Sequence, residues 1–269
     1  MNTGLKNYHN ILVTGLCRSG TTWLGKILGY NIQYINEPFS LAIEKNRKVV
    51  KRDYEYIYYG SSIQRKQEFE NHIESLIKKD RFLLKSPFSL FSSKWFKETF
   101  NIEPLVSMRN PLSFVSSYIF HKWDQRMNCF LEQNDLIKEI KPFKEEIETI
   151  IPGDIINQAI ILWNIGSYFT AKHNLRIIKN EDLSLNPIYY FKKLYEEFNL
   201  DFNNDVINEI MATTTYGGKY FIWGTKRNSI ENINIWKKRL SKQEINYILK
   251  KTEPYWFNYY ANLSENICY

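Results

Sequence analysis

Residues 11–22 constrain the fold of this chain more than any other stretch, because a short apolar run there passes through a loop of small residues into an amphipathic segment. The run at 11–13 has the length and β-branched content of a buried parallel strand. Gly15 and Gly20 permit a tight turn, and a helix is expected to open at Thr21. The first backbone N–H groups of a helix have no helical partner, so this loop is predicted to bind a phosphate or sulfate group.

Side chains of the same loop favour that anion site. Thr21 and Thr22 supply hydroxyl donors, and Arg18 supplies a permanent positive charge with several N–H donors. An ordinary nucleoside triphosphate loop carries Lys after its second glycine, whereas Thr21 follows Gly20 here. The loop therefore keeps the spacing of such a loop and lacks its lysine. A strand–turn–helix unit that binds no ligand is the alternative interpretation.

The string RSGTTWL at residues 18–24 resembles the 5′-phosphosulfate loop of the sulfotransferase family, whose sulfuryl donor is 3′-phosphoadenosine 5′-phosphosulfate (PAPS). This resemblance implies that the loop holds the donor nucleotide. The residues implicated are Arg18, Ser19, Gly20, Thr21, Thr22 and Trp23.

A second motif, RNPLSFVSS at residues 109–117, follows another predicted strand. Pro111 suits the first turn of a helix. Ser117 lies eight positions after Arg109, so the arginine at the strand end and the hydroxyl about two turns into the helix can converge on one phosphate. The arrangement resembles the 3′-phosphate site of sulfotransferases. Two phosphate sites on separate strand ends fit a bisphosphate nucleotide better than a mononucleotide.

Two charged residues are expected beside the anion loop, because strands predicted at 31–36 and 81–85 end at Glu37 and Lys85. In open parallel sheets, ligands collect beyond the carboxyl ends of the strands. Glu37 could take a proton from an acceptor hydroxyl, and Lys85 could approach the transferring group. The alternatives are a solvated carboxylate or arginine partner for Glu37, and an ordinary surface lysine for Lys85.

The sequence departs from one family pattern after Lys85. Cytosolic small-molecule sulfotransferases carry Lys-Thr-His there, with the histidine as base, whereas Pro87 stands in that place here. The chain is closer to the bacterial and carbohydrate branches, which resemble it in having a glutamate after the second strand. Glu37 is therefore the leading candidate base, and His121, four residues after Ser117, is the alternative. The same resemblance favours a saccharide or glycolipid acceptor.

The rest of the chain fits a single domain over residues 1–269, because this length and 43% hydrophobic content suffice for one large core. We expect an α/β fold with a P-loop-like nucleotide site and a mainly parallel sheet of about five strands flanked by helices. Segments near 41–63 and 123–152 are assigned to the acceptor side. A loop at about 213–240 resembles the family's nucleotide-covering loop, which implies that Lys226 and Arg227 contact the 3′-phosphate.

Composition leaves two rival functions. The net charge of +7 suits an anionic ligand, a nucleic acid or an acidic membrane surface. A nucleic-acid-binding module is disfavoured because the basic residues are dispersed without a recognition motif, and a nucleotide kinase because of the missing loop lysine. Three separated cysteines indicate neither a disulfide framework nor a zinc site. We expect a cytoplasmic, metal-free enzyme without a transmembrane segment, which leaves peripheral membrane contact open.

Overall fold

The structure is a computed structural model that describes residues 9–40, 66–214 and 229–260. Within these ranges, five strands form one parallel sheet in the order β2-β3-β1-β4-β5. The strands are β1 (Asn10–Gly15), β2 (Gln33–Asn36), β3 (Phe82–Lys85), β4 (Ile102–Met108) and β5 (Arg176–Lys179). The predicted α/β fold with a mainly parallel sheet is therefore confirmed.

The strand order determines where the functional loops lie. Strand β1 pairs with β3 on one side, where Val13 is in register with Lys85, and with β4 on the other, where Gly15 is in register with Ser107. All pairings are parallel, so the carboxyl ends meet at one edge of the sheet. The loop that follows β1 is consequently flanked by the segments that follow β3 and β4.

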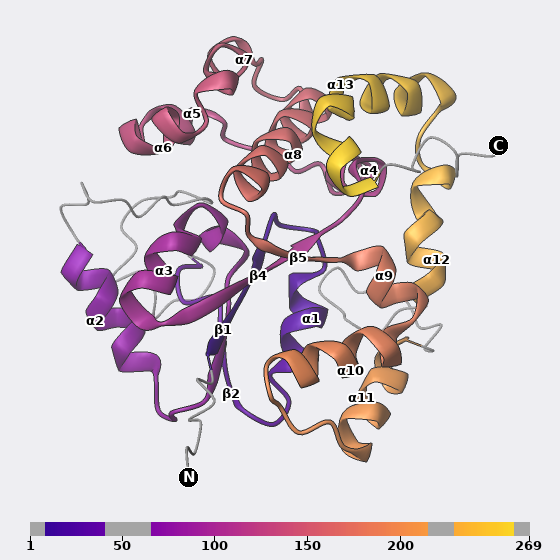
Figure 1. Cartoon of the computed structure of the whole chain (residues 1–269). Helices are drawn as coiled ribbons and strands as arrows, with labels where there is room; N and C mark the ends of the chain where they lie inside the picture. Colours follow the sequence, from indigo (N-terminus) through magenta and orange to yellow (C-terminus); the bar gives the residue numbers. More distant parts are fainter. Residues whose placement is uncertain (1–8, 41–65, 215–228, 261–269) are drawn as a thin grey trace.

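Each face of the sheet packs against its own helices, because successive strand residues point to opposite faces. Ile11 and Val13 belong to a core with helices α1, α10 and α11, while Leu12 lies in a separate core with α2 and α3. Figure 1 shows these two groups on opposite sides of the strands. The bounds are α1 (Thr21–Leu28), α2 (Lys66–Leu76), α3 (Ser93–Phe100), α10 (Pro187–Glu197) and α11 (Asn204–Thr214).

A third group of helices forms the largest core cluster, together with Leu16, Val106 and Met108 from the sheet and its first loop. Its main helices pack closely on one another in Figure 1: α4 (Pro111–His121), α8 (Ile155–Lys172) and α13 (Lys242–Tyr260). An insertion adds α5 (Asn128–Leu131), α6 (Asn134–Glu139), η3 (Lys141–Phe143) and α7 (Lys144–Thr149). The remaining elements are η2 (Pro87–Ser92), α9 (Asn180–Leu185), α12 (Ser229–Asn234) and η4 (Ile235–Lys238).

The local predictions agree with the structure in some segments and differ from it in others. The apolar periodicity predicts a helix over residues 155–172, and α8 has these bounds. The segment 123–152 contains short helices and no strand, as its composition predicts. The sequence pattern also predicts a helix at 89–100, and in the structure this segment begins with the 3-10 turn η2. It predicts no helix at 204–214, where α11 lies. The aromatic stretch that begins at 253 is helical as far as Tyr260, because α13 continues through Pro254. The acceptor-side segment expected at 41–63 lies outside the described residues.

None of the helices in the described part of the chain combines the length and the apolar character that a bilayer crossing requires. The cytoplasmic location stays a prediction.

Replacing Gly15 by alanine should destabilise the fold strongly. Gly15 has φ +142°, and an added Cβ would lie 2.3 Å from the backbone oxygen of Ser107 on β4. The clash and the backbone strain together should lower the free energy of unfolding by about 2–4 kcal/mol, measured by urea denaturation. Gly153→Ala is the matched control, because Gly153 also has a positive φ (+86°) but no heavy atom within 4 Å. It should cost about 1 kcal/mol. Equal losses in the two variants would contradict this account.

Candidate active site

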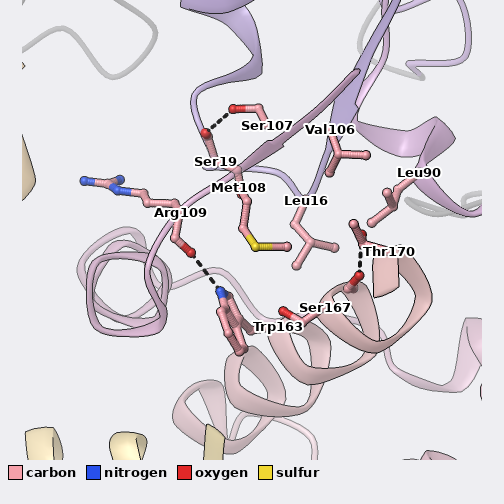
Figure 2. A pocket seen from close by; sticks show the side chains of 11 residues that line it. Leu16, Ser19, Leu90, Val106, Ser107, Met108, Arg109, Trp163, Ser167 and Thr170 are labelled. Atoms are coloured by element: carbon pink, nitrogen blue, oxygen red, sulfur yellow. Dashed lines mark hydrogen bonds between the residues drawn. The ribbon is translucent and has the colours of Figure 1, made fainter. Parts of the chain in front are cut away.

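The loop between β1 and α1 is held by backbone and hydroxyl contacts. The Ser19 N–H donates to the Leu16 carbonyl at 3.2 Å, and the Ser19 carbonyl accepts from the Ser107 hydroxyl at 2.6 Å (Figure 2). Gly20, at φ 92°, is the N-cap of α1 and provides no side-chain cap. The first-turn N–H groups of α1 are thus left for an outside acceptor, which is the geometry expected of an anion site.

Gly20 also has a close neighbour that the sequence did not indicate. A Cβ at this position would lie 2.2 Å from the side-chain nitrogen of Asn180, so the first residue of α9 packs directly on the loop. Asn180 is buried. The amide of Asn180 thereby joins the wall of the predicted anion site.

Arg18 reaches across to α4. Its Nε donates to the Ser117 hydroxyl at 3.0 Å, and its Nη2 lies 2.7 Å from His121 Nε2. The guanidinium also stands over the Trp123 ring, with 5.4 Å from Cζ to the ring centroid. Because a guanidinium only donates, His121 Nε2 is the acceptor in this contact. The structure therefore brings together three predicted site residues, Arg18, Ser117 and His121.

Arg109 is buried at the end of β4 and points toward the same loop. Its Nη1 is 3.5 Å from the Arg18 carbonyl, and its Nη2 donates to the Asn232 carbonyl of α12 at 3.0 Å. The Arg109 carbonyl accepts from Trp163 Nε1 of α8 at 2.9 Å (Figure 2). Arg109 and Ser117 are thus connected through Arg18, which contacts both of them.

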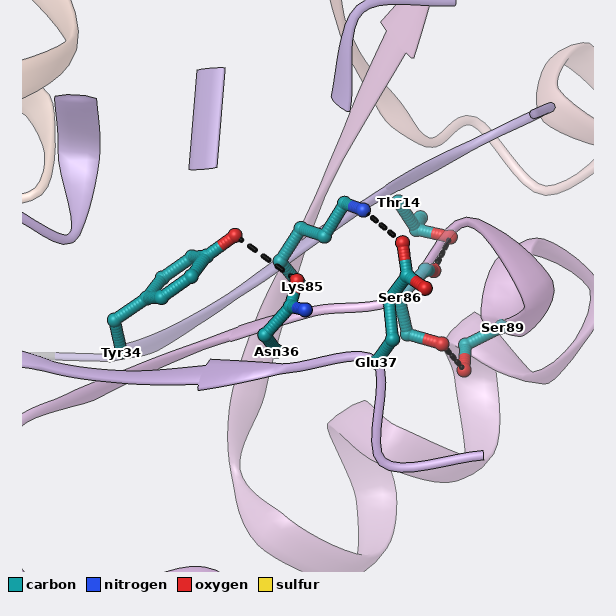
Figure 3. A network of polar contacts seen from close by, with 7 residues as sticks. All are labelled: Thr14, Tyr34, Asn36, Glu37, Lys85, Ser86 and Ser89. Atoms are coloured by element: carbon teal, nitrogen blue, oxygen red, sulfur yellow. Dashed lines mark hydrogen bonds and ion pairs between the residues drawn. The ribbon is translucent and has the colours of Figure 1, made fainter. Parts of the chain in front are cut away.

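Glu37 and Lys85 meet at the ends of β2 and β3. The Glu37 N–H donates to the Lys85 carbonyl at 2.7 Å, which extends the strand pairing by one residue, and Lys85 Nζ forms an ion pair with Glu37 Oε1 (Figure 3). Lys85 is 2% exposed, whereas the Glu37 side chain is 24% exposed. The carboxylate therefore stays accessible to a second molecule while it compensates a buried ammonium group.

Two neighbours shape the surroundings of this ion pair. Gly25 of α1 faces the Lys85 stem, and a Cβ on Gly25 would lie 3.0 Å from Lys85 Cγ. Burial, with a smaller contribution from the Glu37 charge, raises the pKa of Tyr34 well above its usual value. The phenol accordingly stays protonated and donates to Asn36 Oδ1 at 3.2 Å. Glu37 and Lys85 form the ion pair at this corner of the site.

Trp23 lies on α1, one turn from the anion loop, and is half-buried. Its Nε1 donates to the Thr213 hydroxyl at 3.0 Å, and its ring packs edge-on against Phe191 at 5.3 Å between centroids. Thr213 was missed because no helix was predicted at 204–214. Glu181 was not predicted either, although its carboxylate accepts hydrogen bonds from the Asn110 N–H at 3.0 Å and from the Asn110 side-chain amide at 2.6 Å. The N-E-D-L string that contains Glu181 was the available signal.

Some predictions cannot be placed. Lys226 and Arg227 lie outside the described residues. The described residues contain no group of three or more His, Cys, Asp or Glu side chains arranged to hold a metal ion, and the metal-free site stays a prediction.

The family model of the sulfotransferase domain matches residues 9–245 of the sequence. The chain belongs to the sulfotransferase family. As a sulfotransferase, it catalyses sulfuryl transfer, for which the family uses PAPS. A comparison of this sulfotransferase with curated proteins finds no match.

Solved structures similar to this sulfotransferase include the sulfotransferase domain of the curacin biosynthetic pathway, with 15% identity, TM-score 0.49, 91% of this chain and 97% of that chain covered. A mouse sulfotransferase complexed with PAP shows 10% identity and TM-score 0.49 over 96% of this chain and 87% of that one. A sulfotransferase from Alicyclobacillus acidocaldarius shows 12% identity and a TM-score of 0.42 over 88% of this chain and 98% of that one.

Removing only the acid of the ion pair should destabilise the protein, because it leaves buried Lys85 without its carboxylate. Glu37→Ala should lower the free energy of unfolding by about 1–3 kcal/mol, a value reduced for the partial exposure of Glu37. Adding Lys85→Met should restore most of this loss, since an apolar side chain suits the buried position.

Glu103→Ala is the matched control for this series. Glu103 pairs with Lys97 at 2.9 Å, but their side chains are 31% and 57% exposed. Glu103→Ala should change the free energy of unfolding by no more than about 1 kcal/mol. A further loss on adding Lys85→Met, measured by urea denaturation, would contradict the compensating role of Glu37.

Proposed function

We propose that this sulfotransferase moves the sulfuryl group of PAPS to a hydroxyl group of a carbohydrate or glycolipid acceptor, with Glu37 as the general base. The observation that carries the proposal is the Glu37–Lys85 ion pair at the carboxyl edge of the sheet, beside the strand that leads into the anion loop. A reachable carboxylate next to a buried cation is a suitable base beside an otherwise anion-binding site.

The donor is proposed to lie across two groups of cationic and N–H donors. The N-terminus of α1, with Arg18, would hold the 5′-phosphosulfate, while Arg109 and Ser117 would hold the 3′-phosphate. In the structure, Arg109 donates to the neutral Asn232 carbonyl. A phosphate oxygen would form stronger, charge-assisted bonds with the same guanidinium. We propose that Lys226 and Arg227 add further contacts to this phosphate, and that Trp23 lies against the nucleotide.

His121 is the weaker candidate base. Its Nε2 lies 2.7 Å from Arg18 Nη2, so the lone pair that would accept a proton is already engaged by a permanently charged donor. Pro87, at the position of the family histidine, has no proton-accepting side chain. The Glu37 carboxylate also contacts a cation, Lys85, but it has two oxygens that can accept a proton, and its side chain is partly exposed at the strand end.

The reaction follows from this placement. The acceptor hydroxyl oxygen attacks the sulfur and forms the new O–S bond, while its proton passes to the Glu37 carboxylate. The S–O bond to the 5′-phosphate breaks, and its electron pair remains on the phosphate oxygen of the departing 3′,5′-bisphosphate (PAP). Lys85, Arg18 and the N-terminus of α1 would stabilise the negative charge that builds up on this oxygen.

The acceptor class is supported by the sequence departure after Lys85. Pro87 replaces the histidine of the cytosolic small-molecule branch, which leaves the glutamate-bearing carbohydrate and bacterial branches as the better match. The rival functions are an ATP-dependent kinase and a nucleic-acid-binding module. Both predict a different ligand preference from the one proposed here.

Adenosine 3′,5′-bisphosphate should bind at least about tenfold more tightly than ATP or a short oligonucleotide, because we propose that Arg109 and Ser117 bind a 3′-phosphate. Isothermal titration calorimetry with the three ligands measures this preference. A preference for ATP would favour the kinase, and a preference for the oligonucleotide would favour the nucleic-acid module.

Glu37→Gln should reduce sulfuryl transfer by about 10²–10⁴-fold, because the amide keeps the shape and the contact to Lys85 but cannot take a proton. Affinity for adenosine 3′,5′-bisphosphate should stay within about twofold. Glu103→Gln, which makes the same change in a surface ion pair, should leave both quantities unaltered. Full activity in Glu37→Gln would move the base to His121 or another group.

A further inference from the structure

The C-terminal helix α13 ends against the motif that carries Arg109. Its last described residue, Tyr260, is buried, and its hydroxyl donates to Glu181 Oε2 at 3.1 Å. Burial raises the pKa of the Tyr260 hydroxyl well above its usual value, and the nearby charge of Glu181 raises it further. The phenol therefore remains a hydrogen-bond donor to the carboxylate across the physiological pH range.

Glu181 passes this contact on to the start of α4. Its other oxygen, Oε1, accepts from the Asn110 backbone N–H at 3.0 Å and from the Asn110 side-chain amide at 2.6 Å. Asn110 in turn caps α4, because its Oδ1 accepts from the Ser113 N–H at 2.8 Å. One carboxylate thus joins the end of α13 to the N-cap of α4.

The peptide unit between Arg109 and Asn110 is held from both sides. Its N–H belongs to Asn110 and donates to Glu181, while its carbonyl belongs to Arg109 and accepts from Trp163 at 2.9 Å. A peptide unit is planar, so holding the Asn110 N–H and the Arg109 carbonyl fixes the orientation of the peptide plane. It thereby also fixes the ψ angle of Arg109, next to its side chain. The direction of the buried guanidinium therefore depends on this clamp.

We infer that Tyr260 is a positioning residue for the 3′-phosphate site: through Glu181 it holds the Arg109–Asn110 peptide in the orientation that directs Arg109 at the nucleotide. This inference rests on the proposed use of Arg109 as a 3′-phosphate ligand. Tyr260 lies beyond residue 245, where the match to the family model ends. The aromatic end of the chain thereby acquires a role that its sequence did not suggest.

The Tyr260 hydroxyl can affect Arg109 without touching it, because it donates to the charged carboxylate of Glu181. Bonds to charged groups are stronger than bonds between neutral groups, and a partly buried carboxylate such as Glu181 that loses a donor is less well compensated. Without the hydroxyl, Glu181 can rotate and loosen its contacts to Asn110. The Arg109 side chain would then lose more freedom on binding a phosphate, which weakens binding of nucleotides that carry a 3′-phosphate and spares those that do not.

Tyr260→Phe in the full chain tests this inference, with calorimetric affinities for adenosine 3′,5′-bisphosphate and for 5′-AMP, which lacks the 3′-phosphate. The bisphosphate affinity should fall by about 3- to 10-fold, while the 5′-AMP affinity stays within about twofold. Tyr259→Phe is the matched control, because it removes a neighbouring hydroxyl of the same helix that donates to the Ser167 carbonyl at 3.2 Å. It should alter neither affinity.

Glu181→Gln provides the second variant and does not depend on how well Tyr260→Phe folds. It should cause the same selective loss, and adding Tyr260→Phe to it should cause little further loss if the effect runs through Glu181. Equal weakening of both ligands by Tyr260→Phe, or a selective loss in Tyr259→Phe as well, would overturn the inference. A wild-type protein without preference for the bisphosphate would overturn the proposed function too, whereas an unchanged preference in Tyr260→Phe would overturn the inference alone.

Discussion

Cationic side chains from three neighbouring strand ends lie at one edge of the sheet, and the surrounding residues must compensate their charges. Arg18 follows β1, Lys85 ends β3 and Arg109 follows β4, so the strand order brings them together. Like charges at one edge of a sheet repel each other, and each of these cations has an oxygen partner: Ser117 for Arg18, Glu37 for Lys85 and backbone carbonyls for Arg109. An incoming polyanion would meet preorganised donors.

These partners bind their cations with different strengths, which indicates different functions for the three cations. Arg109 is held by backbone carbonyl oxygens and Arg18 by the Ser117 hydroxyl and His121 Nε2, and phosphate or sulfate oxygens would bind both guanidinium groups more strongly. Lys85 is held by a carboxylate and is almost fully buried, so its pairing is part of the folded structure. In the proposed reaction, Glu37 therefore has two duties, since it compensates Lys85 and accepts the proton of the acceptor hydroxyl.

The sequence predicts the parts of this site that depend on local pattern. The apolar run before Gly15, the strand ends at Glu37 and Lys85, and the Arg109 motif all follow from the periodicity of short segments, and the structure places them at one edge. Contacts between distant segments could not be predicted in the same way. Glu181 contacts Asn110 across 71 positions and Tyr260 contacts Glu181 across 79, and neither pair leaves a local signature. The missed helix α11 likewise hid the contact of Thr213 with Trp23.

The proposed function requires that a sulfuryl group passes from PAPS to a hydroxyl group of the acceptor. The most direct measurement incubates the protein with PAPS labelled at the sulfur and a fractionated cell extract, and follows both the label and the release of adenosine 3′,5′-bisphosphate. We expect the label to move into a carbohydrate or glycolipid fraction as the bisphosphate is released. Label that appears only as free sulfate would contradict the proposed function. So would a parallel incubation in which the extract accepts labelled phosphate from ATP but no label from PAPS.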